Sequence, residues 1–161
     1  MGKKNKLTTK ELEFLKESNA IEREFSKKAL NDAIKAWSFA KEQKRLDYWK
    51  ILGIHQILMQ RLRPDIAGKI RNCVVYIGGE RKDQNPREIK DSLMNISPIS
   101  PNTEKTIKRW HIAFEAIHSF EDGNGRVGRI LMNVQRLKAK LPLLIIHTGI
   151  EQQEYYGWFR R

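Results

Sequence analysis

Apolar side chains recur at steps of three or four residues through most of the chain, and no other feature constrains its fold as strongly. The first such segment follows Thr8-Thr9-Lys10-Glu11, a sequence typical of the capping box that begins a helix. The same rhythm predicts further helices over residues 29–40, from Tyr48 to near Arg63-Pro64, over 87–95, from Thr103 to His118, and from Arg126 onward. The chain is therefore expected to be mainly α-helical.

One short stretch departs from the helical pattern. VVYI at 74–77 is a β-branched and aromatic run, and two glycines and a polar segment follow it. This order predicts a strand and a turn, or a complete β-hairpin, within residues 72–86. The prolines and serines at 97–101 are interpreted as a connection inside one domain. The sequence thus predicts a single domain over 8–161, a helical bundle with a short hairpin, behind a basic tail at 1–7.

The chain is strongly basic. Its 161 residues carry 31 lysines and arginines against 19 acidic residues, a formal net charge of +12. Such an excess favours a partner that carries phosphate. The basic residues are mostly scattered among acids, however, and no zinc-finger spacing is present. We therefore expect a charged, solvated surface, and nucleic-acid binding stays as a less favoured alternative that rests on charge alone.

The sequence indicates a cytoplasmic location. The single cysteine, Cys73, has no partner for an internal disulfide, which suits a reducing compartment. The N-terminal residues are basic but lack the apolar core of a signal peptide. The longest apolar run, LPLLII at 141–146, is too short to span a bilayer, so no membrane association is expected.

The stretch HSFEDGNGRVGR, residues 118–129, joins two predicted helices and concentrates charge and glycine. Gly123-Asn124-Gly125 cannot continue a helix comfortably, but it can turn the backbone and gather unpaired N–H groups. The following helix would direct its positive end to the same place, which makes an anion site. Arg126 and Arg129 lie three residues apart and project from one side of that helix, as suits several phosphates in a row.

Two further side chains complete a candidate catalytic centre. Asp122 precedes the glycines and can hold a hard cation such as Mg²⁺ against phosphate oxygens. His118 falls on the inward stripe of the preceding helix with Trp110, His111 and Phe114, within reach of the same centre as a general base. The plain alternative is a helix–turn–helix corner whose charges meet solvent and whose histidine belongs to the core. Spacing alone leaves these two interpretations about even.

The remaining histidines are interpreted as structural. His55, His111 and His147 are not spaced as a metal-ligand set. Cys73 likewise has no neighbour that marks it as a nucleophile. No second centre is therefore predicted.

The stretch 118–129 also resembles the signature of the Fic (filamentation induced by cAMP) domain family, His-x-Phe-x-Asp/Glu-Gly-Asn-Gly-Arg-x-x-Arg, at every specified position. FEAIHSF leads into it as in the family, although Ser119 stands where proline is usual. GIHQILM at 53–59, VYIGG at 75–79 and QQEYYGWF at 152–159 are similar to the family's upstream helix, its β-hairpin flap and the helix after its core. The resemblance covers nearly all of residues 10–160 and implies the Fic fold.

The resemblance implies a protein adenylyltransferase that moves AMP from ATP to a Ser, Thr or Tyr hydroxyl of a target protein and releases pyrophosphate. His118 would take the hydroxyl proton, and Asp122 would bind Mg²⁺ at the α- and β-phosphates. The backbone of Gly123, Asn124 and Gly125 would form the anion hole, with the Asn124 side chain helping to place the α-phosphate. The two arginines would hold the far phosphates, Arg126 the β-phosphate region and Arg129 the γ-phosphate.

The flap would align an extended segment of the target by strand addition, through Tyr76, Ile77, Gly78 and Gly79. The resemblance also implies self-association and self-modification as expectations, beside ATP and an unknown target protein. One branch of the family, the death-on-curing toxins, transfers phosphate instead and departs from the second half of the motif. Gly125 and Arg129 are both present here, which favours AMP transfer. Phosphocholine transfer, and a module that binds nucleotide but is silenced, stay open as alternatives.

The N-terminal helix is similar to a brake found in many family members. ESNAIERE at 17–24 resembles the inhibitory pattern Ser/Thr-x-x-x-Glu-Gly/Asn, within a candidate inhibitory helix at 8–25. Ser18 and Glu22 match, whereas Arg23 replaces the Gly/Asn. Glu22 would then compete with the γ-phosphate for Arg129. The alternative is an ordinary amphipathic helix with surface charge.

Overall fold

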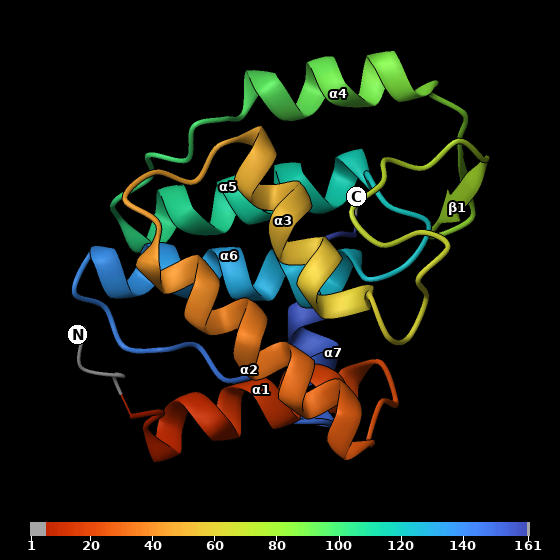
Figure 1. Ribbon diagram of the computed structural model, residues 1–161. Helices are drawn as coiled ribbons and strands as arrows, with labels where there is room; N and C mark the ends of the chain where they lie inside the picture. Colours follow the sequence, from red (N-terminus) through yellow and green to blue (C-terminus); the bar gives the residue numbers. More distant parts are fainter. Residues whose placement is uncertain (1–5, 161) are drawn as a thin grey trace.

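The computed structural model describes residues 6–160, which form seven helices and a two-stranded sheet (Figure 1). The helices are α1 (Thr9–Ile21), α2 (Lys27–Glu42), α3 (Tyr48–Met59), α4 (Pro86–Asn95), α5 (Glu104–Ile117), α6 (Asn124–Lys138) and α7 (Ile150–Gly157), and the strands are β1 (Val75–Ile77) and β2 (Glu80–Lys82). The predicted mainly helical fold with a hairpin is confirmed. The basic tail predicted at 1–7 lies outside the described residues except for Lys6 and Leu7.

Side-chain caps begin five of these helices. Each cap accepts a hydrogen bond from a first-turn N–H group that has no partner inside the helix. The caps are Thr8, Ser26, Asp47, Asn85 and Thr103. Helices α6 and α7 follow Gly123 and Gly149 and have no side-chain cap. The first N–H groups of α6 therefore have no side-chain cap in the described part of the chain.

Helix α6 lies at the centre of the bundle, with α1, α2, α3 and α5 packed against it (Figure 1). Of its residues from Asn124 to Arg136, all but Gly125 are buried, including both arginines of the motif. Helix α4 packs on α3 and α5 on the side away from α1 (Figure 1). The central position of α6 holds the motif in a rigid setting, because four helices fix the element that carries it.

Three predicted helix boundaries are wrong. One is the start of α6, which begins at Asn124 and not at Arg126. Helix α3 ends at Met59, and turns follow where the helix was expected to reach Arg63-Pro64. In that turn the Arg61 Nε donates to buried Asp32 of α2 at 2.8 Å, a contact that sequence periodicity does not register. Helix α5 ends at Ile117, because His118 has a left-handed backbone with φ of 50° and ψ of 61°. A residue in that conformation terminates an α-helix.

The β-hairpin is confirmed. Strand β1 pairs antiparallel with β2, and Tyr76 lies opposite Arg81. Gly78 and Gly79 both have positive φ values, of 54° and 81°. This is the backbone that a two-residue hairpin turn requires and that glycine adopts without strain. Tyr76 is 68% exposed, so the hairpin presents an aromatic ring to solvent.

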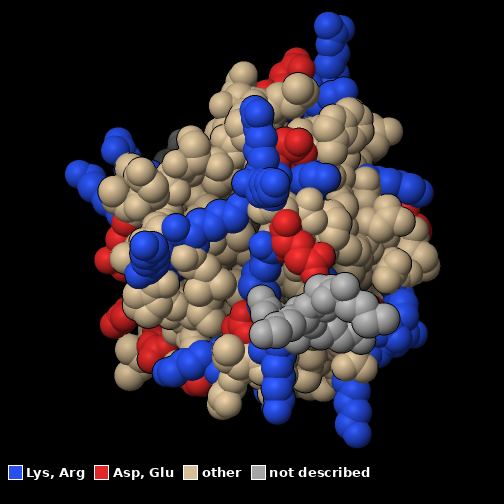
Figure 2. Space-filling model, turned by 60° about the vertical axis from the view of Figure 1, so that its left-hand side comes forward, with Lys and Arg blue, Asp and Glu red and all other residues tan. Residues whose placement is uncertain are grey.

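The face of the molecule drawn in Figure 2 carries its charge in a dispersed form. Lys and Arg side chains spread across this face, with acidic side chains between them. Among residues 6–160, no helix combines the length and the apolar character that crossing a membrane requires.

Candidate active site

Residues 118–123 form a tight loop that connects α5 to α6. Gly123 has φ of 88°, and a Cβ atom there would lie 3.0 Å from the Met59 Sδ and 3.3 Å from the His55 ring. Both its conformation and the space around it therefore require glycine. Because the backbone turns sharply here, the first N–H groups of α6 have no preceding helical turn to bond to.

These N–H groups form the candidate anion hole. Those of Asn124, Gly125 and Arg126 have no hydrogen-bond acceptor among residues 6–160. The Asn124 side chain is engaged within the loop, since its Oδ1 accepts from the Phe120 N–H at 3.0 Å and its Nδ2 donates to the Phe120 carbonyl at 2.7 Å. That side chain shapes the loop, and the backbone N–H of the same residue is what remains for an anion.

His55 of α3 anchors the loop through three contacts. Its ring stacks on Phe120 at a centroid distance of 3.8 Å, its Nδ1 accepts from the Gly68 N–H, and its Nε2 donates to the Asp122 carbonyl at 2.8 Å. Burial lowers the pKa of His55 to about 4, so the ring is neutral at pH 7. His55 was predicted to be structural, and these contacts hold the motif loop in place. Its place beneath the motif was not predicted, because the two hydrogen-bonded residues are 67 positions apart.

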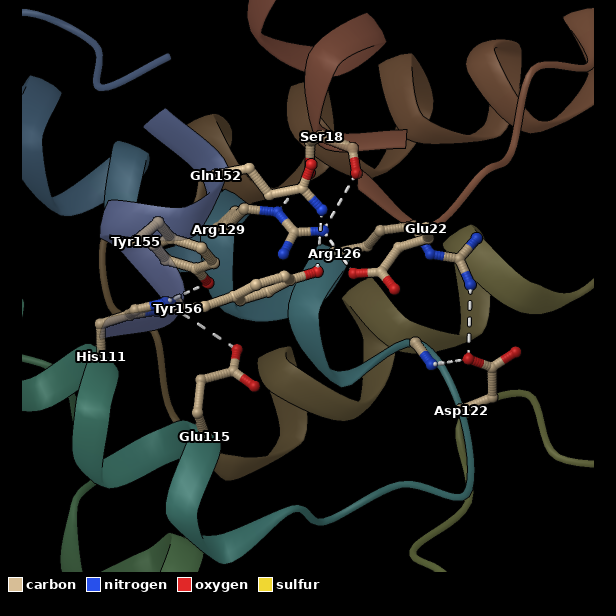
Figure 3. Close-up of polar contacts among 11 residues, drawn as sticks. Ser18, Glu22, His111, Glu115, Asp122, Arg126, Arg129, Gln152, Tyr155 and Tyr156 are labelled. Carbon is tan, nitrogen blue, oxygen red and sulfur yellow. Dashed lines mark hydrogen bonds and ion pairs between the residues drawn. The ribbon is translucent and has the colours of Figure 1, made fainter. Parts of the chain in front are cut away.

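Three charged side chains of the motif gather around the hole (Figure 3). Arg126 is 5% exposed, and its Nη2 lies 3.7 Å from the Asp122 Oδ1. Asp122 also accepts the Gly123 N–H at 2.7 Å, while its side chain stays 54% exposed. Arg129 is 2% exposed. Two buried guanidinium groups beside unpaired N–H groups suit a chain of phosphates.

Helix α1 brings Ser18 and Glu22 onto Arg129 (Figure 3). The Arg129 Nε donates to the Ser18 Oγ at 2.8 Å, and its Nη2 donates to the Ser18 carbonyl at 3.0 Å and to the Glu22 Oε1 at 2.8 Å. The carboxylate also covers Gly125, since a Cβ atom there would lie 2.7 Å from the Glu22 Oε1. A carboxylate just after α1 thus lies against both Gly125 of the anion hole and Arg129.

A buried polar cluster supports Arg129 from behind. The Tyr155 ring centroid lies 5.8 Å from its Cζ, and the Tyr155 hydroxyl lies 2.8 Å from the His111 Nε2. Glu115 approaches that nitrogen at 4.0 Å. Burial raises the pKa of Glu115 to about 7 and lowers that of His111 to about 3. Sequence reasoning missed Glu115 and Tyr155, since nothing in their local spacing distinguishes them from ordinary helix residues.

His118 is half-buried at the edge of the loop. Burial and, next, the positive charge of Arg71 lower its pKa below the usual value. A histidine that is neutral at pH 7 can accept a proton, as a general base must. Arg71 comes from the segment before the hairpin and was not predicted as a site residue.

The donor set suits Mg²⁺ only together with phosphates. Within residues 6–160, no three His, Cys, Asp or Glu side chains are grouped as a metal site. Mg²⁺ is commonly held by one or two carboxylates while substrate phosphates supply other oxygens. The exposed carboxylate of Asp122 beside the hole fits that arrangement.

A model of the Fic/DOC family matches residues 45–135, more than half of the chain, and this range includes the hairpin and the motif through Arg129. The chain belongs to the Fic/DOC family. The family expected from the motif is thereby confirmed.

Two curated relatives of this chain are both named protein adenylyltransferases. "Protein adenylyltransferase fic-1" of Caenorhabditis elegans is 28% identical over 124 residues, which cover 73% of this chain and 24% of that protein. "Protein adenylyltransferase Fic" of Aedes aegypti is 30% identical over 118 residues, which cover 68% and 23%. The Fic domain therefore spans about a quarter of the length of these relatives.

Solved structures share its fold. The C. elegans Fic-1 structure superposes with a TM-score of 0.74 at 18% identity, over 94% of this chain and 55% of that one. A Fic domain containing signaling protein from Bacteroides thetaiotaomicron gives 0.73 at 21% identity, over 91% and 69%. At these identities the likeness establishes the Fic fold and nothing finer.

Proposed function

We propose that this Fic domain is a protein adenylyltransferase that transfers AMP from ATP to a hydroxyl group of a target protein, and that Glu22 restrains it. The observation that carries the proposal is the N-terminus of α6, where three N–H groups have no partner among residues 6–160 and lie beside the buried Arg126 and Arg129. That combination suits a polyphosphate rather than a single carboxylate. The shared name of the curated relatives supports AMP transfer as the reaction.

The chemistry is an in-line transfer. The hydroxyl oxygen of the target bonds to the α-phosphorus while the bond from that phosphorus to the pyrophosphate oxygen breaks. His118 accepts the hydroxyl proton, for which its lowered pKa suits it. The N–H groups of α6 stabilise the charge on the α-phosphate, and the two arginines offset the charge of the departing pyrophosphate. Most of the rate enhancement comes from holding the reacting groups in fixed positions, since the protein supplies little covalent chemistry.

Asp122 would hold Mg²⁺ in this proposal. Its carboxylate is exposed beside the hole and already oriented by the Gly123 N–H. When bound there with nucleotide, the ion would neutralise charge between adjacent phosphates.

Glu22 acts as the brake. Its carboxylate accepts from the same guanidinium that would hold the γ-phosphate, and two negative groups cannot share that position. Ser18 reinforces the arrangement, because it accepts from Arg129 through both its hydroxyl and its carbonyl. ATP would bind fully only after the end of α1 withdraws.

The hairpin would hold the target. Within residues 6–160 its sheet has two strands, which leaves each strand with one unpaired edge. An extended peptide can add to such an edge through backbone hydrogen bonds. Exposed Tyr76 would contact the side chains of that peptide.

The test uses ATP labelled separately at the α- and γ-phosphates, with Mg²⁺ and a cell lysate. Four proteins are compared: the parent chain, Glu22→Gly, His118→Ala and the control Glu17→Ala, which alters α1 away from Arg129. We expect protein labelled from the α-position alone, more strongly with Glu22→Gly and equally with Glu17→Ala. His118→Ala should transfer about 10²–10⁴-fold more slowly while still binding ATP. Label on the chain itself would reveal self-modification.

Two results would contradict the proposal. Label from the γ-position would mean phosphate transfer. No label in any sample, despite ATP binding, would favour a silenced module or a different donor. Equal labelling by the parent and Glu22→Gly would refute the inhibitory role of Glu22 but not AMP transfer.

A further inference from the structure

Arg71 is buried without an acidic partner. It is 2% exposed, and no carboxylate lies within salt-bridge distance of it among residues 6–160. Burial lowers even its own pKa. A buried charge is costly unless hydrogen bonds compensate it. The buried charge of Arg71 must therefore be compensated by the polar groups that its guanidinium hydrogen-bonds.

One set of these groups belongs to the motif loop. The Arg71 Nε donates to the His118 carbonyl at 2.6 Å. The Arg71 backbone N–H donates to the next carbonyl, that of Ser119, at 2.9 Å. The segment before the hairpin thus holds the loop at two successive carbonyls, where His118 has its left-handed backbone.

The other set belongs to the ends of the hairpin. The Arg71 Nη1 donates to the Cys73 carbonyl at 2.9 Å, before β1, and to the Lys82 and Gln84 carbonyls at 3.4 Å, at the end of β2 and beyond it. Its Nη2 donates to the Gln84 Oε1 at 3.2 Å. One guanidinium therefore ties both ends of the hairpin to the backbone of His118.

The charge of Arg71 also acts on the His118 ring. It opposes protonation of the imidazole, after burial, whereas Asp122 and Glu22 favour protonation. Hydrogen bonds from a charged group are the stronger kind and favour a fixed geometry. Arg71 is consequently suited both to orient His118 and to keep it unprotonated.

We propose that Arg71 is a positioning residue that joins His118 to the hairpin, so that the base and the surface that aligns the target keep one fixed relation. The inference rests on the proposed function for its catalytic meaning. Its physical content, a link between residue 118 and residues 75–82, stands on the hydrogen bonds alone.

The experiment compares Arg71→Gln, which removes the charge and the fork of donors, with Arg71→Lys, which keeps the charge and loses the fork. Arg63→Gln is the control, because Arg63 is an exposed arginine that pairs with Asp65 and with Glu121 of the same loop. NMR follows the titration of the His118 ring and the backbone order parameters of residues 75–82. Both readouts are independent of any transfer reaction.

For Arg71→Gln we expect His118 to titrate at higher pH than in the parent, and order parameters in 75–82 to fall into the flexible range, below about 0.6. For Arg71→Lys the titration should stay near that of the parent, while the hairpin loosens. In a Glu22→Gly background, Arg71→Gln should lower kcat for transfer about 100-fold, as misplacement of a reacting group does, with unchanged ATP affinity. Arg63→Gln should alter none of these.

An unchanged His118 titration together with an unchanged hairpin in folded Arg71→Gln would overturn the proposal. If Arg71→Gln does not fold, Arg71→Lys decides, and a hairpin as ordered as in the parent would refute the link. A rate that falls only in proportion to the folded fraction would indicate a merely structural role. Should no variant transfer AMP, the NMR readouts still decide the link, so that failure of the proposed function is recognised separately.

Discussion

Arg23 occupies the position after the end of α1 where the family's inhibitory pattern has Gly or Asn. Its φ is 55°, in the left-handed region. The Arg23 N–H donates to the Ala20 carbonyl at 2.9 Å, and the Glu24 N–H donates to the Asn19 carbonyl at 3.0 Å. These two bonds form a Schellman motif, which favours glycine at the left-handed position. The turn that presents Glu22 to Arg129 is therefore strained by its own next residue.

Arg23→Gly should relieve that strain and tighten the proposed brake. The Arg23 side chain is exposed and has no hydrogen bond or ion pair within residues 6–160, so little else is lost. A left-handed backbone costs a non-glycine residue roughly 1–2 kcal/mol, of which about 1 kcal/mol remains after allowing for glycine's freedom in the unfolded chain. A shift of about 1 kcal/mol changes an equilibrium about five-fold.

Two measurements follow from this magnitude. The Tm of thermal unfolding should rise by about 2–4 °C in a chain of this size. The initial rate of AMP transfer should fall about five-fold in the parent background and stay unchanged in the Glu22→Gly background, where no brake remains. Arg23→Ala is the control, because it removes the charge and keeps the strain. A higher Tm without a lower rate would refute the link between this turn and the brake, and equal effects of Gly and Ala would show that charge, not strain, is responsible.

Three further perturbations test the site. Urea unfolding should show that the stability of Glu115→Gln, measured against that of the parent, increases by about 3 kcal/mol between pH 4.5 and pH 7. Within that window the folded parent, with a Glu115 pKa of about 7, binds more protons than the unfolded chain, so its stability declines with pH. Gly123→Ala should lower unfolding free energy by about 2–4 kcal/mol, from strain at φ of 88° and crowding against Met59, whereas Gly157→Ala, with open space around it, should not. Asp122→Asn should bind ATP in the presence of Mg²⁺ no better than the parent binds it with EDTA, by calorimetry; undiminished Mg²⁺-dependent binding would exclude Asp122 as the ligand.

The helices were predictable because their signals are local. The capping box at Thr8 and Glu11, the apolar spacing in α2 and α5, and the paired glycines of the hairpin each lie within one element. The helix ends were less predictable. Apolar spacing continues to His118, but the left-handed backbone at that residue ends α5 one residue earlier. Periodicity reports which face would be buried and does not report where the backbone stops being helical.

The motif, by itself, predicted the chemistry of the proposed centre: a base, an anion hole, two arginines and a carboxylate within residues 118–129. The resemblance, in addition, predicted the meeting of Glu22 with Arg129 and assigned Ser18 to the same inhibitory pattern. Only the tertiary structure decided how these groups are held. His55 supports the loop from 67 residues away, and Arg71 ties His118 to the hairpin from 47 residues away. Neither residue has a local pattern that marks it, because a hydrogen bond across the fold depends on how helices and loops pack, which spacing along the chain does not encode.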